Sequence, residues 1–142
     1  MNFIAVCGNK YCGKDTIADY LIEQHGFVKY SFAHPVKQIA KLLFHLTEDQ
    51  LYGKNKDIID TRWGLSPRLI MQRIGTEFGQ YQIYNIFPEL KDKIKEKELW
   101  LESFKLFFSK NKDKRIVIAD LRFNHEYNFL KKHHFNIIKV ER

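Results

Sequence analysis

The stretch NFIAVCGNKYCGKDTIADYLIEQ, residues 2–24, decides the fold of this chain. It contains the pattern G-x-x-x-x-G-K at Gly8, Gly13 and Lys14, which is typical of a phosphate-binding loop. The apolar run 3–7 before the pattern predicts a buried strand, and the apolar residues after it recur at helical spacing. Strand, glycine-rich loop and helix in this order form the local structure that the pattern requires.

The residue types of this loop suit the binding of anionic oxygens. Gly8 and Gly13 allow turn conformations that are closed to residues with a Cβ, so that the loop amides can point inward. The following helix adds free N–H groups and the positive end of its dipole, and we expect Lys14 to reach the β- and γ-phosphates. The alternative is a glycine-rich turn before an ordinary helix. The further candidates for nucleotide binding in this loop are Asn9, Lys10, Cys12, Asp15 and Thr16.

The residue after Lys14 departs from the commonest form of the pattern. Asp15 stands where Ser or Thr usually binds Mg²⁺, and Thr16 follows it. The sequence G-K-D-T resembles the G-K-x-T of nucleoside monophosphate kinases, in which the Thr supports the phosphates and Mg²⁺ is held largely through water. We expect Asp15 to lie in the first helical turn and to point away from the phosphates, and Thr16 to be a candidate metal ligand.

Length and composition favour one globular domain in a reducing compartment. The chain has 142 residues, of which 44% are hydrophobic and 15% aromatic. No apolar run approaches a membrane span, and the sequence starts without the layout of a signal peptide, so we expect a cytoplasmic protein with no membrane partner. We expect Cys7 and Cys12, which flank the loop, to be free thiols.

The net charge of +7 fits an anionic ligand, which could be a nucleotide or a nucleic acid. A cluster of lysines lies in residues 91–97, far in sequence from the loop, where a solvated lysine-rich surface is the simpler explanation. We therefore do not expect a nucleic-acid partner.

A second marked helix begins at Ser66-Pro67, where Ser66 suits the N-cap and Pro67 the first helical position. On a helical wheel one face carries Arg68, Gln72, Gly75 and Gly79, with Thr76 beside it. Each interior glycine costs about 1 kcal/mol against Ala, so something should pack closely there, either a ligand or a neighbouring helix. Arg68 can offer a bidentate fork to a phosphate, and Gln72 can read a base edge.

Residues 27–32 predict a strand whose carboxyl end should face the site. Lys37, near the start of the helix that Pro35 can open, would meet an anion there or lie at the surface. Residues 47–62 read as a mobile connection, residues 80–98 as an insertion or helical extension, and residues 99–108 as a helix.

The clearest central strand is 115–120, and an apolar strand ending in Asp is the Walker B layout, in which the carboxylate helps to hold hydrated Mg²⁺. We expect Asp120 to take this role through water and Arg122 to point toward the site. A helix over 126–132 and a strand over 135–140 follow.

Four motifs together resemble the phage and large-DNA-virus deoxynucleoside monophosphate kinases: G-N-K-Y-C-G-K-D-T, S-F-A-H-P-V-K, W-G-L-S-P-R-L-I-M-Q-R-I-G-T-E-F-G and V-I-A-D-L-R-F-N-H-E. The resemblance implies an adenylate-kinase-like fold and ATP-dependent phosphorylation of a deoxynucleoside monophosphate (dNMP), with Mg²⁺. It assigns catalytic roles to Lys14, Arg68, Asp120 and Arg122. The substrate-side candidates are Phe32, Lys37, Trp63, Arg68, Gln72, Thr76 and Glu77.

The expected fold is α/β, a three-layer P-loop fold with a mostly parallel sheet flanked by helices and a short or missing lid. We expect a single domain with its core in 1–46 and 99–142 and a substrate-binding helical part over about 47–98. Two features depart from the family: Gln80 replaces a basic residue, and the sequence ends soon after the last strand. The alternatives are a catalytically weak or inactive nucleotide-binding interaction module, which the chain end motivates, and a phosphomevalonate kinase. A homodimer is compatible with the sequence.

Overall fold

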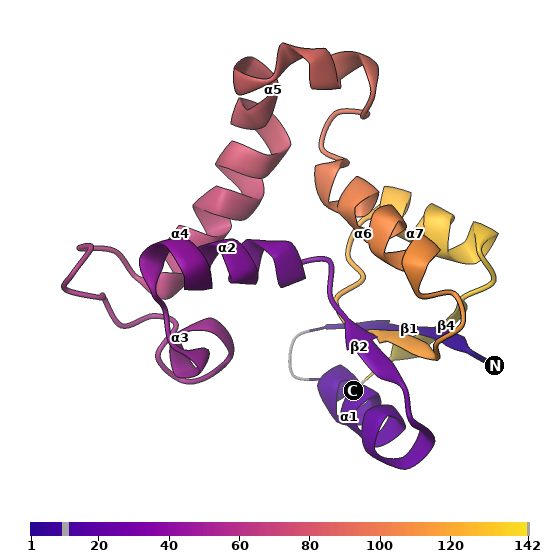
Figure 1. The fold of residues 1–142 in the computed structure, drawn as a ribbon. Helices are drawn as coiled ribbons and strands as arrows, with labels where there is room; N and C mark the ends of the chain where they lie inside the picture. Colours follow the sequence, from indigo (N-terminus) through magenta and orange to yellow (C-terminus); the bar gives the residue numbers. More distant parts are fainter. Residues whose placement is uncertain (10–11, 142) are drawn as a thin grey trace. The chain divides into compact units, whose positions relative to one another are not determined.

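The computed structural model describes residues 1–9 and 12–141 (Figure 1). The chain forms two compact units. The first, the sheet unit, comprises Met1–Phe32 and Ser103–Arg142, and the second, the helical unit, comprises Ala33–Glu102. No helix in the described ranges is long and apolar enough to cross a membrane.

The sheet unit contains a four-stranded sheet in the order β2-β3-β1-β4, in which all neighbours run parallel. The strands are β1 (Phe3–Gly8), β2 (Val28–Tyr30), β3 (Ile116–Ile118) and β4 (Asn136–Val140). The centre of the sheet is almost wholly apolar, as expected of parallel strands that are covered on both faces. This sheet with its flanking helices confirms the predicted α/β class.

Helices cover the sheet from opposite sides (Figure 1). On one face, Ala18 of α1 (Lys14–His25) packs in a cluster with Val6 and Val117. On the other face lie α7 (Asn124–Lys132) and the 103–110 part of α6 (Leu99–Lys110). An aromatic cluster fills that side; its ring contacts join Phe3, Tyr30, Phe104, Phe108, Phe129 and Phe135.

The strand order sends the chain in opposite directions after β1 and after β3. From β1 the chain runs through α1 past β3 to β2, whereas from β3 it runs through α7 past β1 to β4. Because crossovers between parallel strands are almost always right-handed, these opposite directions place α1 and α7 on opposite faces. The loops that leave β1 and β3 therefore diverge, and in open α/β sheets ligands bind where such loops diverge.

The helical unit starts with α2 (His34–Phe44), and its core includes Ala40, Leu51 and Ile70. Residues 47–62 are more regular than predicted, since they contain the helix α3 (Glu48–Tyr52). Thr47 and Gln50 form a capping box, which explains why so short a helix is stable.

The predicted helix at Ser66-Pro67 is present. It begins as α4 (Pro67–Arg73), and the Ser66 hydroxyl accepts a hydrogen bond from the Leu69 amide at 3.2 Å. It continues as the π-helix η1 (Ile74–Gln82) and then α5 (Ile83–Ile86). The 3₁₀ helix η2 (Pro88–Asp92) and the first turn of α6 complete the unit.

A neighbouring helix packs on the face that carries the two glycines. The Trp100 indole N–H donates to the Gly75 carbonyl at 2.8 Å. A Cβ at Gly79 would overlap the Trp100 ring, with its Cε2 at 2.7 Å. Packing against Trp100 therefore explains Gly79, whereas a Cβ at Gly75 would make only an ordinary contact with Val36 at 3.6 Å. Close packing of a ligand on this face stays a prediction.

Candidate functional site

The loop after β1 has little space for side chains at its first glycine. A Cβ on Gly8 would lie 2.5 Å from the Cys12 Sγ and 2.6 Å from the Val140 carbonyl oxygen. Gly13 adopts φ 94°, in the left-handed region that favours glycine, and forms the N-cap of α1. The backbone carbonyl of Asn9 accepts a hydrogen bond from the Cys12 amide at 3.2 Å. The predicted loop residue Lys10 lies outside the described residues.

Hydrogen-bond donors converge on this loop. The Lys14 ammonium donates to the Gly8 carbonyl at 3.4 Å, which is long for such a bond. Gly13 has no side chain with which to cap α1, and its carbonyl accepts a hydrogen bond from the Ile17 amide at 3.2 Å. The ammonium and the uncapped start of α1 together make a setting in which an anionic oxygen is stabilised.

Asp15 and Thr16 are both exposed on the first turn of α1. The Asp15 carboxylate forms an ion pair with Lys29 of β2 at 3.7 Å. An exposed pair of this kind contributes at most about 1 kcal/mol, so it does not hold Asp15 in one place.

Asp120 follows β3, and β3 is the neighbour of β1, the strand that leads to the glycine-rich loop. Its Oδ2 accepts a hydrogen bond from the Ser31 hydroxyl at 2.6 Å, and its Oδ1 accepts one from the Phe32 amide at 3.1 Å. Both carboxylate oxygens are therefore anchored to the end of β2. Our sequence interpretation placed the end of β2 at the site but did not select Ser31; a hydroxyl at the carboxyl end of a parallel strand was the available signal.

The Phe32 side chain does not offer an open face to a base. It is 4% exposed, and its ring packs edge-to-face against Phe104 with centroids 5.1 Å apart. Phe32 thus contributes its amide to Asp120 and its ring to the core of the sheet unit.

Glu126 is a second acidic residue near the β3 loop, and the sequence interpretation did not select it. Its carboxylate is buried, and Oε1 accepts hydrogen bonds from the amides of Arg122 and Phe123, both at 3.1 Å. Burial raises the pKa of Glu126 to about 7 against the opposing effect of these two amides, and the negative charge of Asp120 adds to the rise.

The helical unit holds two candidate cations, and both have partners. Arg68 forms a fork with Asp57, in which Nε donates to Oδ1 at 2.6 Å and a terminal nitrogen donates to Oδ2 at 3.3 Å. Lys37 lies over the ring of Tyr52, with its ammonium 4.1 Å from the ring centroid. The bidentate geometry of Arg68 is the one that a phosphate would also accept.

The candidates Gln72, Thr76 and Glu77 lie on one continuous helix, but not on regular α-helical turns. Gln72 is exposed in α4, whereas half-buried Thr76 and exposed Glu77 belong to the π-helix. Because a π-helix bonds from residue i to i+5, the faces beyond Ile74 are rotated from those of the predicted α-helical wheel. π-Helical turns occur frequently at functional sites. A substrate-binding role for these three residues stays a prediction.

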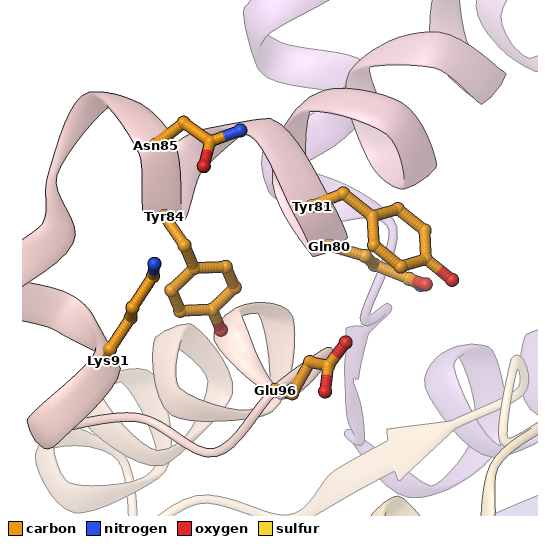
Figure 2. A pocket seen from close by; sticks show the side chains of 6 residues that line it. All are labelled: Gln80, Tyr81, Tyr84, Asn85, Lys91 and Glu96. Carbon is orange, nitrogen blue, oxygen red and sulfur yellow. The ribbon is translucent and has the colours of Figure 1, made fainter.

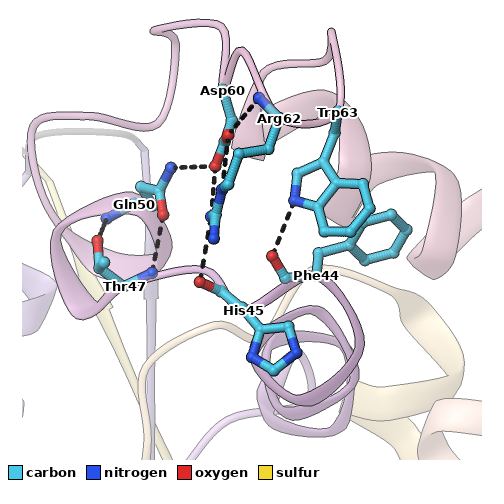
Figure 3. A network of polar contacts seen from close by, with 7 residues as sticks. All are labelled: Phe44, His45, Thr47, Gln50, Asp60, Arg62 and Trp63. Carbon is cyan, nitrogen blue, oxygen red and sulfur yellow. Dashed lines mark hydrogen bonds and ion pairs between the residues drawn. The ribbon is translucent and has the colours of Figure 1, made fainter.

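Trp63 lies on a loop that a polar network fixes (Figure 3). Asp60 is buried and accepts hydrogen bonds from Arg62 at 3.0 and 2.7 Å and from the Gln50 amide group at 3.0 Å. The hydrogen bonds from Arg62 hold the pKa of Asp60 well below its usual range. The Trp63 indole donates to the Phe44 carbonyl at 2.9 Å, and the residue remains 42% exposed. This network orients the exposed indole.

A pocket of about 390 Å³ opens in the helical unit (Figure 2). The Tyr84 hydroxyl donates to the Lys95 carbonyl at 3.1 Å beside it. Its lining includes Gln80, the residue that departs from the family pattern, but none of the predicted substrate residues. The lining residues are Gln80, Tyr81, Tyr84, Asn85, Lys91 and Glu96.

These features define a parallel α/β protein whose candidate ligand residues lie at the carboxyl ends of the adjacent strands β1 and β3. The family model for deoxynucleotide monophosphate kinases matches residues 2–59. A protein of Acanthamoeba polyphaga mimivirus, provisionally named a deoxynucleotide monophosphate kinase, is 37% identical over 149 aligned residues, which cover 100% of this chain and 75% of that protein. The chain belongs to the deoxynucleotide monophosphate kinase family, which confirms the predicted resemblance. A kinase of this family acts on a small nucleotide.

Proposed function

We propose that the protein transfers the γ-phosphate of ATP to a deoxynucleoside monophosphate and so forms the diphosphate. The observation that carries this proposal is that β1, which leads to the glycine-rich pattern, and β3, which leads to Asp120, are adjacent and parallel, so that both end at the same edge of the sheet. Family membership supports the choice of a deoxynucleotide as acceptor.

ATP would bind through its phosphates at the loop after β1. A Cβ at Gly8 would overlap Cys12 and the Val140 carbonyl, so only glycine lets the loop pack against β4 at this point. The long 3.4 Å bond from Lys14 to a neutral carbonyl is weak, and a phosphate oxygen would be the stronger, charge-assisted partner. Lys14 and the first amides of α1 would then stabilise the charge on the oxygens of the transferred group.

The residues around Asp120 fit a hydrated Mg²⁺ ion. Magnesium prefers oxygen ligands, keeps several waters and needs only one or two carboxylates from the protein. Asp120 is a carboxylate held at both oxygens by the end of β2, and Thr16 supplies an exposed hydroxyl on α1. When bound, the ion would neutralise charge on the phosphates. Ser31 and the Phe32 amide would keep Asp120 oriented, so that it need not reorganise.

The acceptor nucleotide would be recognised by side chains of the helical unit. In the sheet unit, Arg122 remains a candidate for contact with a phosphate. Arg68 would exchange the Asp57 carboxylate for the dNMP phosphate, because both anions accept the same planar fork. The oriented, exposed ring of Trp63 is better suited to stack on the base than the buried ring of Phe32. Lys37, Gln72, Thr76 and Glu77 remain candidates for contacts to the phosphate, sugar and base edge.

The test is ADP release from Mg-ATP with each of the four dNMPs, one at a time, for the wild type, Lys14→Met and Lys114→Met. Lys114 is a matched control, since it is an exposed lysine of the sheet unit that lies just before the amino end of β3. We expect turnover with at least one dNMP, its loss in Lys14→Met and its retention in Lys114→Met. If the wild type binds ATP but releases no ADP with any of the four dNMPs, the kinase function is refuted and a nucleotide-binding module remains.

A further inference from the structure

A buried carboxylate supports the loop that carries Asp120 and Arg122. Glu126 is only 4% exposed, although it lies in the first turn of α7. One of its oxygens accepts two consecutive backbone amides, those of Arg122 and Phe123, each at 3.1 Å. No element of the proposed nucleotide binding so far uses this residue.

These two bonds fix a segment that has no other regular support. Residues 119–122 belong to no helix or strand, so no backbone ladder sets their conformation. At one end, Asp120 is tied to Ser31 and to the Phe32 amide. At the other end, Glu126 gathers the two amides that precede α7. The segment 120–123 is thus held at both ends by side-chain contacts.

Capping of α7 alone does not explain a buried glutamate here. Glu126 is at the third helical position and accepts from the amide of the N-cap residue Phe123, as in a capping box. Its second bond, from the Arg122 amide, lies outside that motif. Burying a carboxylate is costly, and the nearby Asp120 charge adds to that cost. The bond to the Arg122 amide reaches one residue beyond the cap, which indicates that the conformation of the preceding loop matters.

We propose that Glu126 is a positioning residue for phosphoryl transfer, which orients Asp120 and Arg122 by holding the backbone between them and α7. This inference rests on the proposed kinase function. Because ATP would be anchored chiefly by the loop after β1, loss of Glu126 should lower kcat and leave the KM for ATP nearly unchanged. The relevant property of Glu126 is the place of its acceptor oxygen, not its charge.

Three variants separate the acceptor from the charge. Glu126→Gln keeps the length and the acceptor oxygen but removes the charge. Glu126→Asp keeps the charge but withdraws the acceptor by one methylene, and Glu126→Met keeps the approximate length without an acceptor. Leu130→Ala is the control, because Leu130 is fully buried one turn further along the same helix.

The measurements are kcat and the KM for ATP below the melting temperature of each variant, and hydrogen exchange of the Arg122 and Phe123 amides. We expect the kcat of Glu126→Gln to stay within about threefold of the wild-type value. Glu126→Asp and Glu126→Met should lower kcat by about 10- to 100-fold with little change in the KM for ATP. The two amides should exchange faster in Asp and Met than in the wild type and Gln.

Several results would overturn the proposal. Full kcat in Glu126→Asp and Glu126→Met, or an equal loss in Leu130→Ala, would reduce Glu126 to a structural residue of α7. If Glu126→Met does not fold, the kcat values of the other two variants decide. A role for the acceptor oxygen predicts a higher kcat for Glu126→Gln than for Glu126→Asp, and a role for the charge predicts the reverse. A wild type without turnover would instead refute the kinase function, and unchanged exchange of the two amides would refute the ordering role independently.

Discussion

The stability of the protein should depend on the protonation of Glu126. Burial raises its pKa from the ordinary 4.5 to about 7, with a further rise from Asp120, while the amides of Arg122 and Phe123 and the charge of Arg122 act in the opposite direction. The folded state therefore binds this proton more tightly than the unfolded chain does. The resulting stabilisation is fully present below pH 4.5 and is lost as the pH rises through about 7.

The magnitude follows from the two pKa values. The difference between 4.5 and about 7, at about 1.4 kcal/mol for each pKa unit, amounts to about 3 kcal/mol. Domains of this size are stable by only about 5–15 kcal/mol, so the effect should be easy to detect. The perturbation is Glu126→Gln, which removes the titrating group and keeps the acceptor oxygen.

Urea denaturation from about pH 4 to about pH 8 would measure the free energy of unfolding of both proteins. All other titrating groups are common to them, so the difference between the two curves reports Glu126. We expect the wild type to lose about 3 kcal/mol relative to the variant as the pH rises across this range. A difference that stays constant with pH, or that changes in the opposite direction, would show that Glu126 ionises in the fold as it does in the unfolded chain.

Three further predictions concern other contacts. Gly79→Ala should destabilise the fold by about 1–3 kcal/mol in urea denaturation, because its Cβ would overlap Trp100; Gly75→Ala, whose Cβ would lie 3.6 Å from Val36, is the control, and equal effects would contradict the packing. Ser31→Ala removes the 2.6 Å bond to Asp120 and should lower kcat about tenfold with little loss of ATP affinity by calorimetry, whereas an unchanged kcat would show that Asp120 needs no such anchor. Arg68→Lys keeps the charge but loses the fork, so the KM for the dNMP should rise while ATP affinity stays the same; an unaltered KM would exclude Arg68 from the acceptor site.

Much of the sheet unit could be predicted from the sequence, because its signals are local. The strand, loop and helix around Gly8 to Lys14 follow one another directly, and β3 is a short apolar run that ends near Asp120. The start of α4 could be predicted for the same reason, because the N-cap residue Ser66 and Pro67 at the first helical position are adjacent in sequence.

The features that escaped prediction depend on contacts between distant residues. Ser31 and Asp120 are separated by 89 positions, and no local pattern pairs them. The burial of Phe32 depends on Phe104, and the close packing at Gly79 depends on Trp100. The five-residue helix α3 is too short to show a period, although Thr47 and Gln50 carried its capping signal.

The central claim is that this chain moves a phosphoryl group from ATP to a dNMP. The most direct measurement is transfer of label from γ-labelled ATP, with the products separated into dNDP and inorganic phosphate. We expect the label in the dNDP of the preferred base, and none there with Lys14→Met. Label that appears only as inorganic phosphate, or that remains in ATP with every dNMP, would contradict the account.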